Sequence, residues 1–287
     1  MRFGAHVSVA GGIDRAPERA AAIGAETYQV FVKSNRQWRA GRLADATVSG
    51  FRRQHREHGL GAAFAHGCYL VNLASPHTSV RERSIRCCAV ELGRCARLGL
   101  EGLVIHPGAH LGIGVEAGLN RIARALDRLP IDRCRVLLEV TAGQGTTIGG
   151  RHEEIAWLLQ RFAPELLGVC LDSCHLHAAG HALDSARRVA AALELIEETI
   201  GFERIHLIHL NDSAGAAGSR LDRHRGIGDG TIGDAGFRHL LQDPRVRRLP
   251  GILETPKGEG TRLDRRNLAR LRALAAGKRM PRGARRG

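Results

Sequence analysis

Histidine and acidic residues stand at the ends of short apolar runs in this sequence, and imidazole and carboxylate groups are common ligands of divalent metal ions. The clearest case is the run 204–210, which is short, rich in Ile and Leu, and followed by an Asn-Asp turn signal. His209 stands near its end, and a long loop beyond it carries Asp222 and His224. Taken alone, this stretch fits a metal site and a structural histidine beside a solvated loop equally well.

The same pattern recurs at other apolar runs. Runs that end near positions 66, 106, 139, 172 and 254 each close on an imidazole or a carboxylate. Because unpaired buried carboxylates would cost several kcal/mol each, we predict that the set binds two or three divalent cations. The mixture of histidines and carboxylates favours zinc or manganese over magnesium. The predicted ligands are His66, His106, Glu139, Asp172, His175, His209, Asp222, His224 and Glu254.

The elements that must position these side chains are strands that alternate with amphipathic helical segments. Such alternation predicts a parallel sheet, and eight units in 287 residues favour a single-domain α/β fold, the closed (β/α)8 TIM barrel. An open doubly wound sheet is the alternative, but Gly11-Gly12 is too weak a match to its phosphate-binding loop. The predicted strands are 3–7, 27–32, 62–66, 102–106, 136–140, 168–172, 204–210 and 251–254.

In a barrel, the strand ends and the loops that follow them meet at the C-terminal mouth, where barrel enzymes carry their chemistry. Three of these loops are long. Two of them include residues 33–39 and 67–72, and the third follows the seventh strand. We assign residues 1–277 to the barrel domain, and 278–287, which are rich in Arg and Gly, to a basic disordered tail.

Composition bears on the partner and the compartment. The formal net charge of +14 comes almost wholly from arginine, which binds phosphate in a bidentate manner and favours a polyanionic partner. Arginine codons in a GC-rich genome would give the same excess. The seven cysteines are odd in number and several fall in apolar patterns, which indicates a reducing compartment. Without an apolar run of about 18 residues or a signal peptide, we expect a cytoplasmic protein without membrane contact.

The sequence contains several motifs in a fixed order. They are Gly4-Ala5-His6-Val7-Ser8, Arg36-Gln37-Trp38-Arg39, His66-Gly67-Cys68-Tyr69-Leu70-Val71-Asn72-Leu73, His106-Pro107-Gly108, Thr141-Ala142-Gly143-Gln144-Gly145, Asp172-Ser173-Cys174-His175, His209-Leu210-Asn211-Asp212, Asp222-Arg223-His224, Gly228-Asp229-Gly230-Thr231-Ile232-Gly233 and Ile252-Leu253-Glu254-Thr255. These motifs resemble those of endonuclease IV, the zinc-dependent apurinic/apyrimidinic endonuclease family. The resemblance runs from about residue 2 to about residue 275, and so many motifs in one order make it specific. For a protein of this kind we expect a monomer, nucleoid-associated when on DNA.

The resemblance implies a DNA repair endonuclease with a (β/α)8 barrel and three zinc ions. Such an enzyme hydrolyses the phosphodiester 5′ to abasic sites in duplex DNA and leaves a 3′-hydroxyl and a 5′-deoxyribose phosphate. It implies a catalytic Glu139 that bridges the first and second ions. The implied ligand sets are His66, His106 and Glu139 for the first ion, Glu139, Asp172, His209 and Glu254 for the second, and His175, Asp222 and His224 for the third.

The resemblance also implies that Arg36, Tyr69 and Leu70 enter the base stack while the abasic nucleotide turns out into the metal pocket. The sequence departs from the family in a few places. Val140 replaces an asparagine, which removes an amide that could orient a ligand, and Ser34-Asn35 and Gly67-Cys68 are atypical. These departures concern the loops that face DNA more than the metal ligands.

Two other function classes are alternatives. A metal-dependent sugar isomerase or epimerase of the same barrel type needs only a set such as Glu139, Asp172, His209 and Glu254. The other five predicted ligands would then be surplus, and a neutral sugar would not explain the excess of arginine. A nucleic-acid-binding barrel without catalysis would instead bind DNA with a steep salt dependence, hold no metal and cut nothing.

Overall fold

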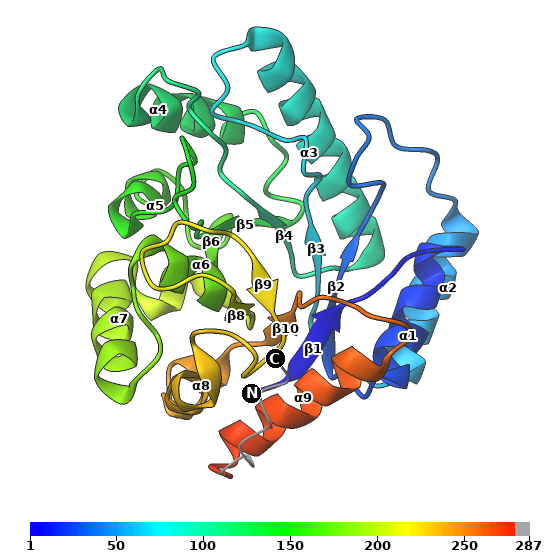
Figure 1. Cartoon of the computed structure of the whole chain (residues 1–287). Coiled ribbons are helices and arrows are strands. Elements are labelled where there is room, and N and C mark those ends of the chain that lie inside the picture. Colours follow the sequence, from blue (N-terminus) through cyan, green and yellow to red (C-terminus); the bar gives the residue numbers. More distant parts are fainter. Residues whose placement is uncertain (279–287) are drawn as a thin grey trace.

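Eight parallel strands close into a barrel in this computed structural model, which describes residues 1–278 (Figure 1). The strand order around the barrel is β1-β10-β7-β6-β5-β4-β3-β2. Because β1 pairs with both β2 and β10, the sheet has no open edge and the doubly wound alternative is wrong. The barrel strands are β1 (Phe3–His6), β2 (Thr27–Phe31), β3 (Ala63–His66), β4 (Gly102–Ile105), β5 (Arg135–Glu139), β6 (Leu167–Asp172), β7 (Ile205–His209) and β10 (Gly251–Leu253).

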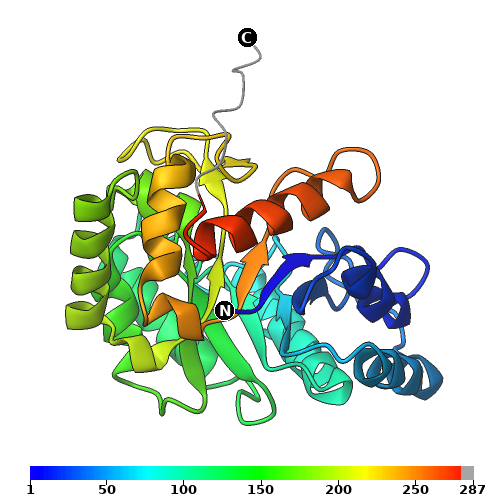
Figure 2. The same ribbon diagram turned by 90° about the horizontal axis from the view of Figure 1, so that it is seen from below.

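The helices form a ring outside the strands (Figure 1), and α9 lies across β1 and β10, where the first and last barrel strands meet (Figure 2). The α-helices are α1 (Ala16–Ala22), α2 (Asp45–Glu57), α3 (Thr78–Leu98), α4 (Val115–Leu126), α5 (His152–Leu159), α6 (Ser173–Ala179), α7 (Ala186–Thr199), α8 (Gly233–Gln242) and α9 (Arg262–Ala275). Three short 3-10 helices are η1 (Ile13–Arg15), η2 (Phe202–Arg204) and η3 (Val246–Arg248). Among residues 1–278, no helix combines the length and the apolar character that a membrane crossing requires.

The eight predicted strands are confirmed, each to within two residues at either end. The loop after the seventh strand contains more structure than the sequence pattern predicts. A small antiparallel pair, β8 (Asp212–Ser213) and β9 (His224–Arg225), folds this loop back over the barrel. Of the predicted tail 278–287, residues 279–287 lie outside the described residues.

Two apolar layers hold the barrel together. Between strands and helices lies the larger core, whereas a separate cluster fills the interior of the barrel. Since side chains alternate between the two faces of a strand, a residue two positions further along points into the barrel again. The interior cluster is Phe64, Val104, Leu137, Cys170, Leu207 and Ile252, and each of these residues precedes a predicted metal ligand by two positions.

Candidate metal centre

Six of the nine predicted ligands form the next inward-facing layer above the interior apolar cluster. The alternation that turns Leu137 into the barrel also turns Glu139 inward, and likewise Leu207 and His209. His66, Glu139, Asp172 and His209 are buried, whereas His106 and Glu254 stand just beyond their strands and keep some solvent access. The convergence of these six side chains therefore follows from the alternation of side chains along each strand and from the closure of the barrel.

The other three predicted ligands come from segments that follow strands. His175 lies in the first turn of α6, whose N-cap is Asp172, and the Asp172 carboxylate accepts a hydrogen bond from the His175 backbone N–H at 2.8 Å. Asp222 and His224 lie on the loop after β7 and reach the centre because β9 pairs with β8. His175 Nε2 is 3.1 Å from Asp222 Oδ1, and His224 Nε2 is 3.4 Å from the same oxygen.

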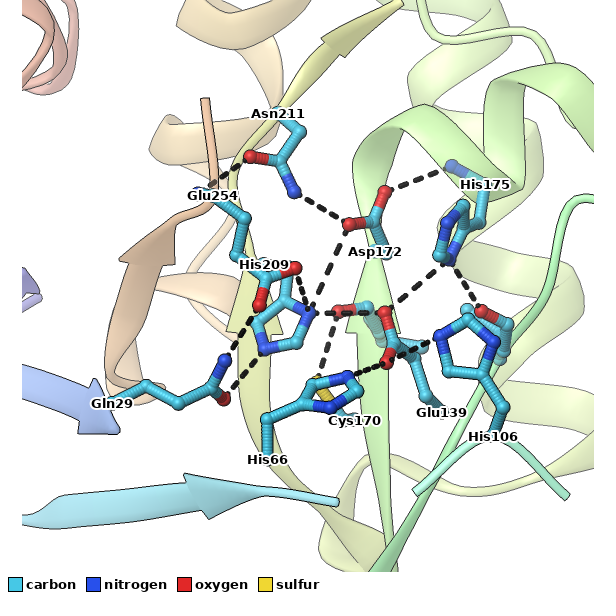
Figure 3. A network of polar contacts seen from close by, with 12 residues as sticks. Gln29, His66, His106, Glu139, Cys170, Asp172, His175, His209, Asn211 and Glu254 are labelled. Atoms are coloured by element: carbon cyan, nitrogen blue, oxygen red, sulfur yellow. Dashed lines mark hydrogen bonds and ion pairs between the residues drawn. The ribbon is translucent and has the colours of Figure 1, made fainter. Parts of the chain in front are cut away.

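Glu139 is fully buried and lies at the middle of the layer (Figure 3). Its Oε2 is 3.1 Å from His66 Nε2 and 3.1 Å from His106 Nε2. Its Oε1 faces the other way, 3.0 Å from His209 Nδ1. Each carboxylate oxygen thus belongs to a different group of nitrogen donors, which is the arrangement that a bridging ligand needs.

The donor atoms of the centre fall into groups whose members all lie within 4.8 Å of one another. A further group combines Asp172, Cys174 and His224, but burial raises the pKa of the Cys174 thiol to about 12, which favours the protonated form that binds metal poorly. The three groups formed by the predicted ligands alone are His66, His106 and Glu139; Glu139, Asp172, His209 and Glu254; and His175, Asp222 and His224.

The donor set fits divalent ions, because three histidines are oriented by backbone carbonyls. The Nδ1 atoms of His66, His175 and His224 lie 3.0, 2.9 and 3.2 Å from the carbonyl oxygens of residues 67, 140 and 254. A proton on Nδ1 leaves a lone pair on Nε2, and in each of these histidines Nε2 faces a carboxylate oxygen. A lone pair and a carboxylate oxygen repel each other, so each such pair needs a cation between its two atoms. Among the described residues, the buried His224 Nε2 has no hydrogen-bond partner at all.

Electrostatics at the centre show the same need for positive charge. Burial raises the pKa of Glu139, yet the surrounding imidazoles outweigh burial and hold that pKa well below its usual range. Burial lowers the pKa of His175, but Asp172 and Asp222 outweigh burial and hold that pKa well above 6.5. The Glu139 carboxylate therefore stays ionised, and the proton on His175 occupies a position that a metal ion would compete for.

The three residues predicted to contact DNA lie at the mouth, on the loops after β2 and β3. Tyr69 and Leu70 are unusually exposed for their type, at 64% and 37%, and Arg36 is exposed as well. The two loops touch, since the Tyr69 N–H donates to the Asn35 carbonyl at 3.1 Å. A pocket of about 270 Å³ opens between Tyr69, Leu70 and the predicted ligands His66 and His106.

A buried ion pair supports these two loops from below. Lys33 Nζ lies 3.8 Å from Glu91 Oε1, and both side chains are about 1% exposed. Lys33 also donates to the Ser34 and Gln37 carbonyls, and Glu91 accepts from the Cys68 N–H at 3.1 Å. Sequence reasoning missed this pair, because Glu91 lies on α3 in an ordinary helical pattern.

The residues that depart from the endonuclease IV motifs make specific contacts in the structure. Val140 is buried, and its carbonyl accepts from His175 Nδ1. Gly67 lies so close to β4 that a Cβ would come within 2.9 Å of Ile105 Cγ2. Cys68 Sγ lies 3.2 Å from the Asn35 carbonyl, so two atypical residues join the two loops.

Sequence reasoning also missed polar residues that contact the predicted ligands. Gln29 contacts His209 and Glu254, and Asn211 Nδ2 donates to Asp172 Oδ2 at 2.6 Å (Figure 3). Asp212, read from the sequence as part of a turn, is a fully buried carboxylate that accepts from several backbone amides. Asn211 and Asp212 follow a strand end directly, which is the one signal that could have identified them.

Known proteins resemble this chain over nearly its whole length. The family profile described as Xylose isomerase-like TIM barrel matches residues 17–274. A probable endonuclease 4 from Chloroflexus aurantiacus is 44% identical over 281 residues, which cover 96% of this chain and 99% of that protein. A probable endonuclease 4 from Trichlorobacter lovleyi is 41% identical over 277 residues, covering 95% of this chain and 99% of that protein.

Solved structures show the same likeness. The crystal structure of endonuclease IV from Thermus thermophilus superposes with a TM-score of 0.86 at 38% identity, and covers 96% of this chain and 100% of its own. A D-tagatose 3-epimerase-like protein superposes with a TM-score of 0.74 at 18% identity, covering 96% of this chain and 99% of its own. The likeness to the epimerase-like protein concerns the fold alone.

Proposed function

This chain belongs to the endonuclease IV family and is an endonuclease of DNA repair, and we propose that it hydrolyses the phosphodiester 5′ to abasic sites in duplex DNA with three zinc ions. The single observation that carries the proposal is the convergence of nine imidazole and carboxylate side chains in three groups of metal-donor atoms at the barrel mouth. The products are a 3′-hydroxyl and a 5′-deoxyribose phosphate.

Each group of donor atoms would hold one ion. Glu139 would contribute to two of these groups, an assignment supported by the opposite directions in which its two oxygens face. The ligand sets are His66, His106 and Glu139; Glu139, Asp172, His209 and Glu254; and His175, Asp222 and His224. Zinc, when bound, supplies a nucleophile derived from water at neutral pH and compensates the negative charge of the phosphate.

The residues of the chain position the reacting groups. Water oxygen bonds to phosphorus as the bond from phosphorus to the 3′ oxygen breaks, and that oxygen leaves with a proton. Glu139 holds the centre of the site with its carboxylate ionised, because the imidazoles around it keep its pKa low. The interior apolar cluster seals the site from below, so the phosphate can enter only from the mouth.

DNA recognition falls to the exposed loop residues. Arg36, Tyr69 and Leu70 enter the base stack at the lesion, and the abasic nucleotide turns out toward His66 and His106. The missing base lowers the cost of turning the nucleotide out, which favours abasic sites over intact duplex. Exposure of Tyr69 and Leu70 beside the 270 Å³ pocket supports this role.

Cleavage of an end-labelled duplex with one abasic site tests the activity. We expect a cut on the 5′ side of the lesion, about three zinc atoms per chain by elemental analysis, loss of both with chelator, and recovery when zinc returns. The matched control is the same duplex without the lesion. Cleavage in full with no metal bound, or cleavage of both duplexes alike, would contradict the proposal.

Tyr69→Ala tests the recognition loops separately from the metal centre. We expect abasic-site cleavage to fall by about 10- to 100-fold, because one stacked aromatic contributes about 1–3 kcal/mol, with the zinc content unchanged. The exposed Leu111 lies on another loop, so Leu111→Ala serves as a control for loss of an exposed apolar side chain. Unchanged cleavage by Tyr69→Ala would remove the insertion role.

A sugar epimerase is less well supported. It would need one metal group, whereas two further groups of donor atoms and the exposed Tyr69 would have no use.

We also propose that the protein acts as a cytoplasmic monomer, nucleoid-associated when on DNA. Sedimentation of the purified protein, alone and with DNA, measures the oligomeric state.

A further inference from the structure

Gln29 is an uncharged, fully buried residue whose amide contacts the side chains of two proposed ligands of the second ion. It lies on β2, a strand that contributes no ligand, and points into the layer where the ligands meet (Figure 3). We propose that Gln29 is a positioning residue that sets the tautomer of His209 and the direction of the Glu254 carboxylate. This inference rests on the proposed metal centre.

The amide of Gln29 can adopt only one orientation among its neighbours. Its Nε2 lies 2.6 Å from Glu254 Oε1, and its Oε1 lies 2.9 Å from His209 Nε2. A flipped amide would place its oxygen against the carboxylate of Glu254, where neither atom can donate. The negative charge of Glu254 therefore fixes which end of the amide faces His209.

An amide oxygen only accepts hydrogen bonds, so His209 must carry its proton on Nε2. The lone pair of His209 is then on Nδ1, the nitrogen that faces the proposed metal position. His209 Nδ1 lies 3.0 Å from Glu139 Oε1 and 3.2 Å from Glu254 Oε2. The histidines at positions 66, 175 and 224 use carbonyls of the backbone for this purpose, whereas His209 uses a side chain.

The second amide proton of Gln29 faces His6 at the end of β1. Gln29 Nε2 lies 3.0 Å from His6 Nδ1, and His6 Nδ1 in turn lies 3.6 Å from Glu254 Oε1. The side chain thereby joins β1, β7 and the residue after β10, three neighbouring positions around the barrel. Removing the amide would leave the His209 N–H buried without an acceptor and free the ring to turn over.

The test replaces Gln29 by Met, which has a similar length but offers neither the donor nor the acceptor. Partners of this kind behind a metal ligand typically change affinity by about 10- to 100-fold. Competition with a chromophoric chelator should show one of three zinc ions bound about 10- to 100-fold more weakly in Gln29→Met. The matched control is Thr27→Val at the opposite end of β2, which loses a buried hydrogen bond to the Ala62 carbonyl but touches no ligand. It should keep all three affinities.

A second readout follows the tautomer directly. Nitrogen chemical shifts of the His209 ring in the chelated protein, recorded at a pH above the raised pKa of this imidazole, should report the Nε2-protonated form in the wild type and a loss of that preference in Gln29→Met. Gln29→Glu keeps an acceptor toward His209 Nε2 but places a second oxygen against Glu254. It should therefore retain the wild-type tautomer of His209 and disturb only the direction of Glu254, which keeps the tautomer testable even if Gln29→Met fails to fold. A retained tautomer in Gln29→Met, or a lost one in Gln29→Glu, would overturn the proposal.

The outcomes separate this inference from the proposed function. A wild-type protein that binds no zinc and cuts no abasic DNA removes the metal centre and, with it, the role of Gln29. A wild-type protein that binds three ions and cuts, together with a folded Gln29→Met that holds all three as tightly, removes only the role of Gln29.

Discussion

Two fully buried carboxylates lie at the same barrel mouth and are surrounded by different kinds of donor group. Glu139, at the end of β5, is surrounded by imidazole nitrogens. Asp212, three residues beyond the end of β7, is surrounded by backbone amides. These amides belong to Ser213 at 2.8 Å, Gly228 at 2.9 Å, Gly230 at 3.0 Å, Ile232 at 3.0 Å and Gly233 at 3.3 Å.

The difference separates a carboxylate that holds a loop in place from a carboxylate that is suited to bind metal. Backbone amides are neutral donors that a metal ion cannot replace, so Asp212 holds the segment from β9 to α8 in place. Imidazoles exchange protons for metal ions, so the surroundings of Glu139 are suited to binding. The two are connected, because the strand β8 that begins at Asp212 pairs with β9, which carries His224.

The largest expected effect comes from Glu139→Gln. The amide cannot bridge two ions as a carboxylate does, so we expect abasic-site cleavage to fall by at least about 10³-fold with loss of zinc. Cleavage rates and elemental analysis measure both, and circular dichroism checks the fold. A variant that stays active with its full zinc content would show that Glu139 is no more than structural.

Asp212→Ala should act on stability whether or not metal is present. The loss of one acceptor for several buried amides should lower the free energy of unfolding by about 3 kcal/mol or more. Urea unfolding with and without chelator measures this effect. In the presence of chelator, Glu139→Gln should lower the free energy of unfolding by less than Asp212→Ala does. Asp212→Asn, which keeps one oxygen, should lose less than Asp212→Ala. If the Asp212 effect vanished in chelator, the contrast would fail.

Proton competition should appear at the histidine-rich centre. Burial lowers the pKa of His175 and of His209, but neighbouring negative groups outweigh burial and hold both pKa values well above 6.5 without metal. Zinc must displace these protons, so its affinity should fall as the pH decreases, by about tenfold per pH unit for each proton displaced. Without metal, the stability of the fold should depend on pH in the opposite direction. The stability that the raised pKa values of His175 and His209 contribute is complete below pH 6.5 and is lost as the pH rises through these pKa values. Calorimetry in buffers of different ionisation enthalpy counts the protons released, and a count of zero would contradict this prediction.

The smallest expected effect concerns a buried histidine without a carboxylate partner. His152 stacks on His181 with ring centroids 4.2 Å apart, and burial lowers the pKa of His152 to about 4. Since the unfolded chain binds this proton near pH 6.5, stability present above 6.5 is lost as the pH falls toward 4. Between about pH 7.5 and 5 the wild type should lose about 1–2 kcal/mol that His152→Phe retains. Urea midpoints at the two pH values measure the difference, and equal losses in both proteins would exclude His152 as the source.

Much of the candidate site was predictable because it depends on the two-residue alternation of side chains along each strand. Strands buried on both faces appear as apolar runs, and parallel strands of a barrel end at one mouth. Phe64 and His66, or Leu207 and His209, are two residues apart and so face the same way. The predicted ligands therefore converge without any knowledge of distances.

Other features were not predictable, because they depend on contacts between residues far apart in the chain. Lys33 and Glu91 are 58 positions apart, and neither strand nor helix pattern shows that they meet under the loops that follow β2 and β3. Gln29 and His209 are 180 positions apart. A glutamine in a buried strand resembles any other buried polar residue until its neighbours are known.

The sequence by itself determined the barrel, the mouth at which the functional residues gather and, through its motifs, the family. Only the tertiary structure decided which oxygen of Glu139 faces which imidazole, which ring nitrogen of His209 is free, and that Asp212 supports the loop and takes no part among the metal-donor groups. The physical reason is that side-chain direction follows from local backbone period, whereas protonation and hydrogen bonding depend on whichever groups the closed barrel brings within about 3 Å.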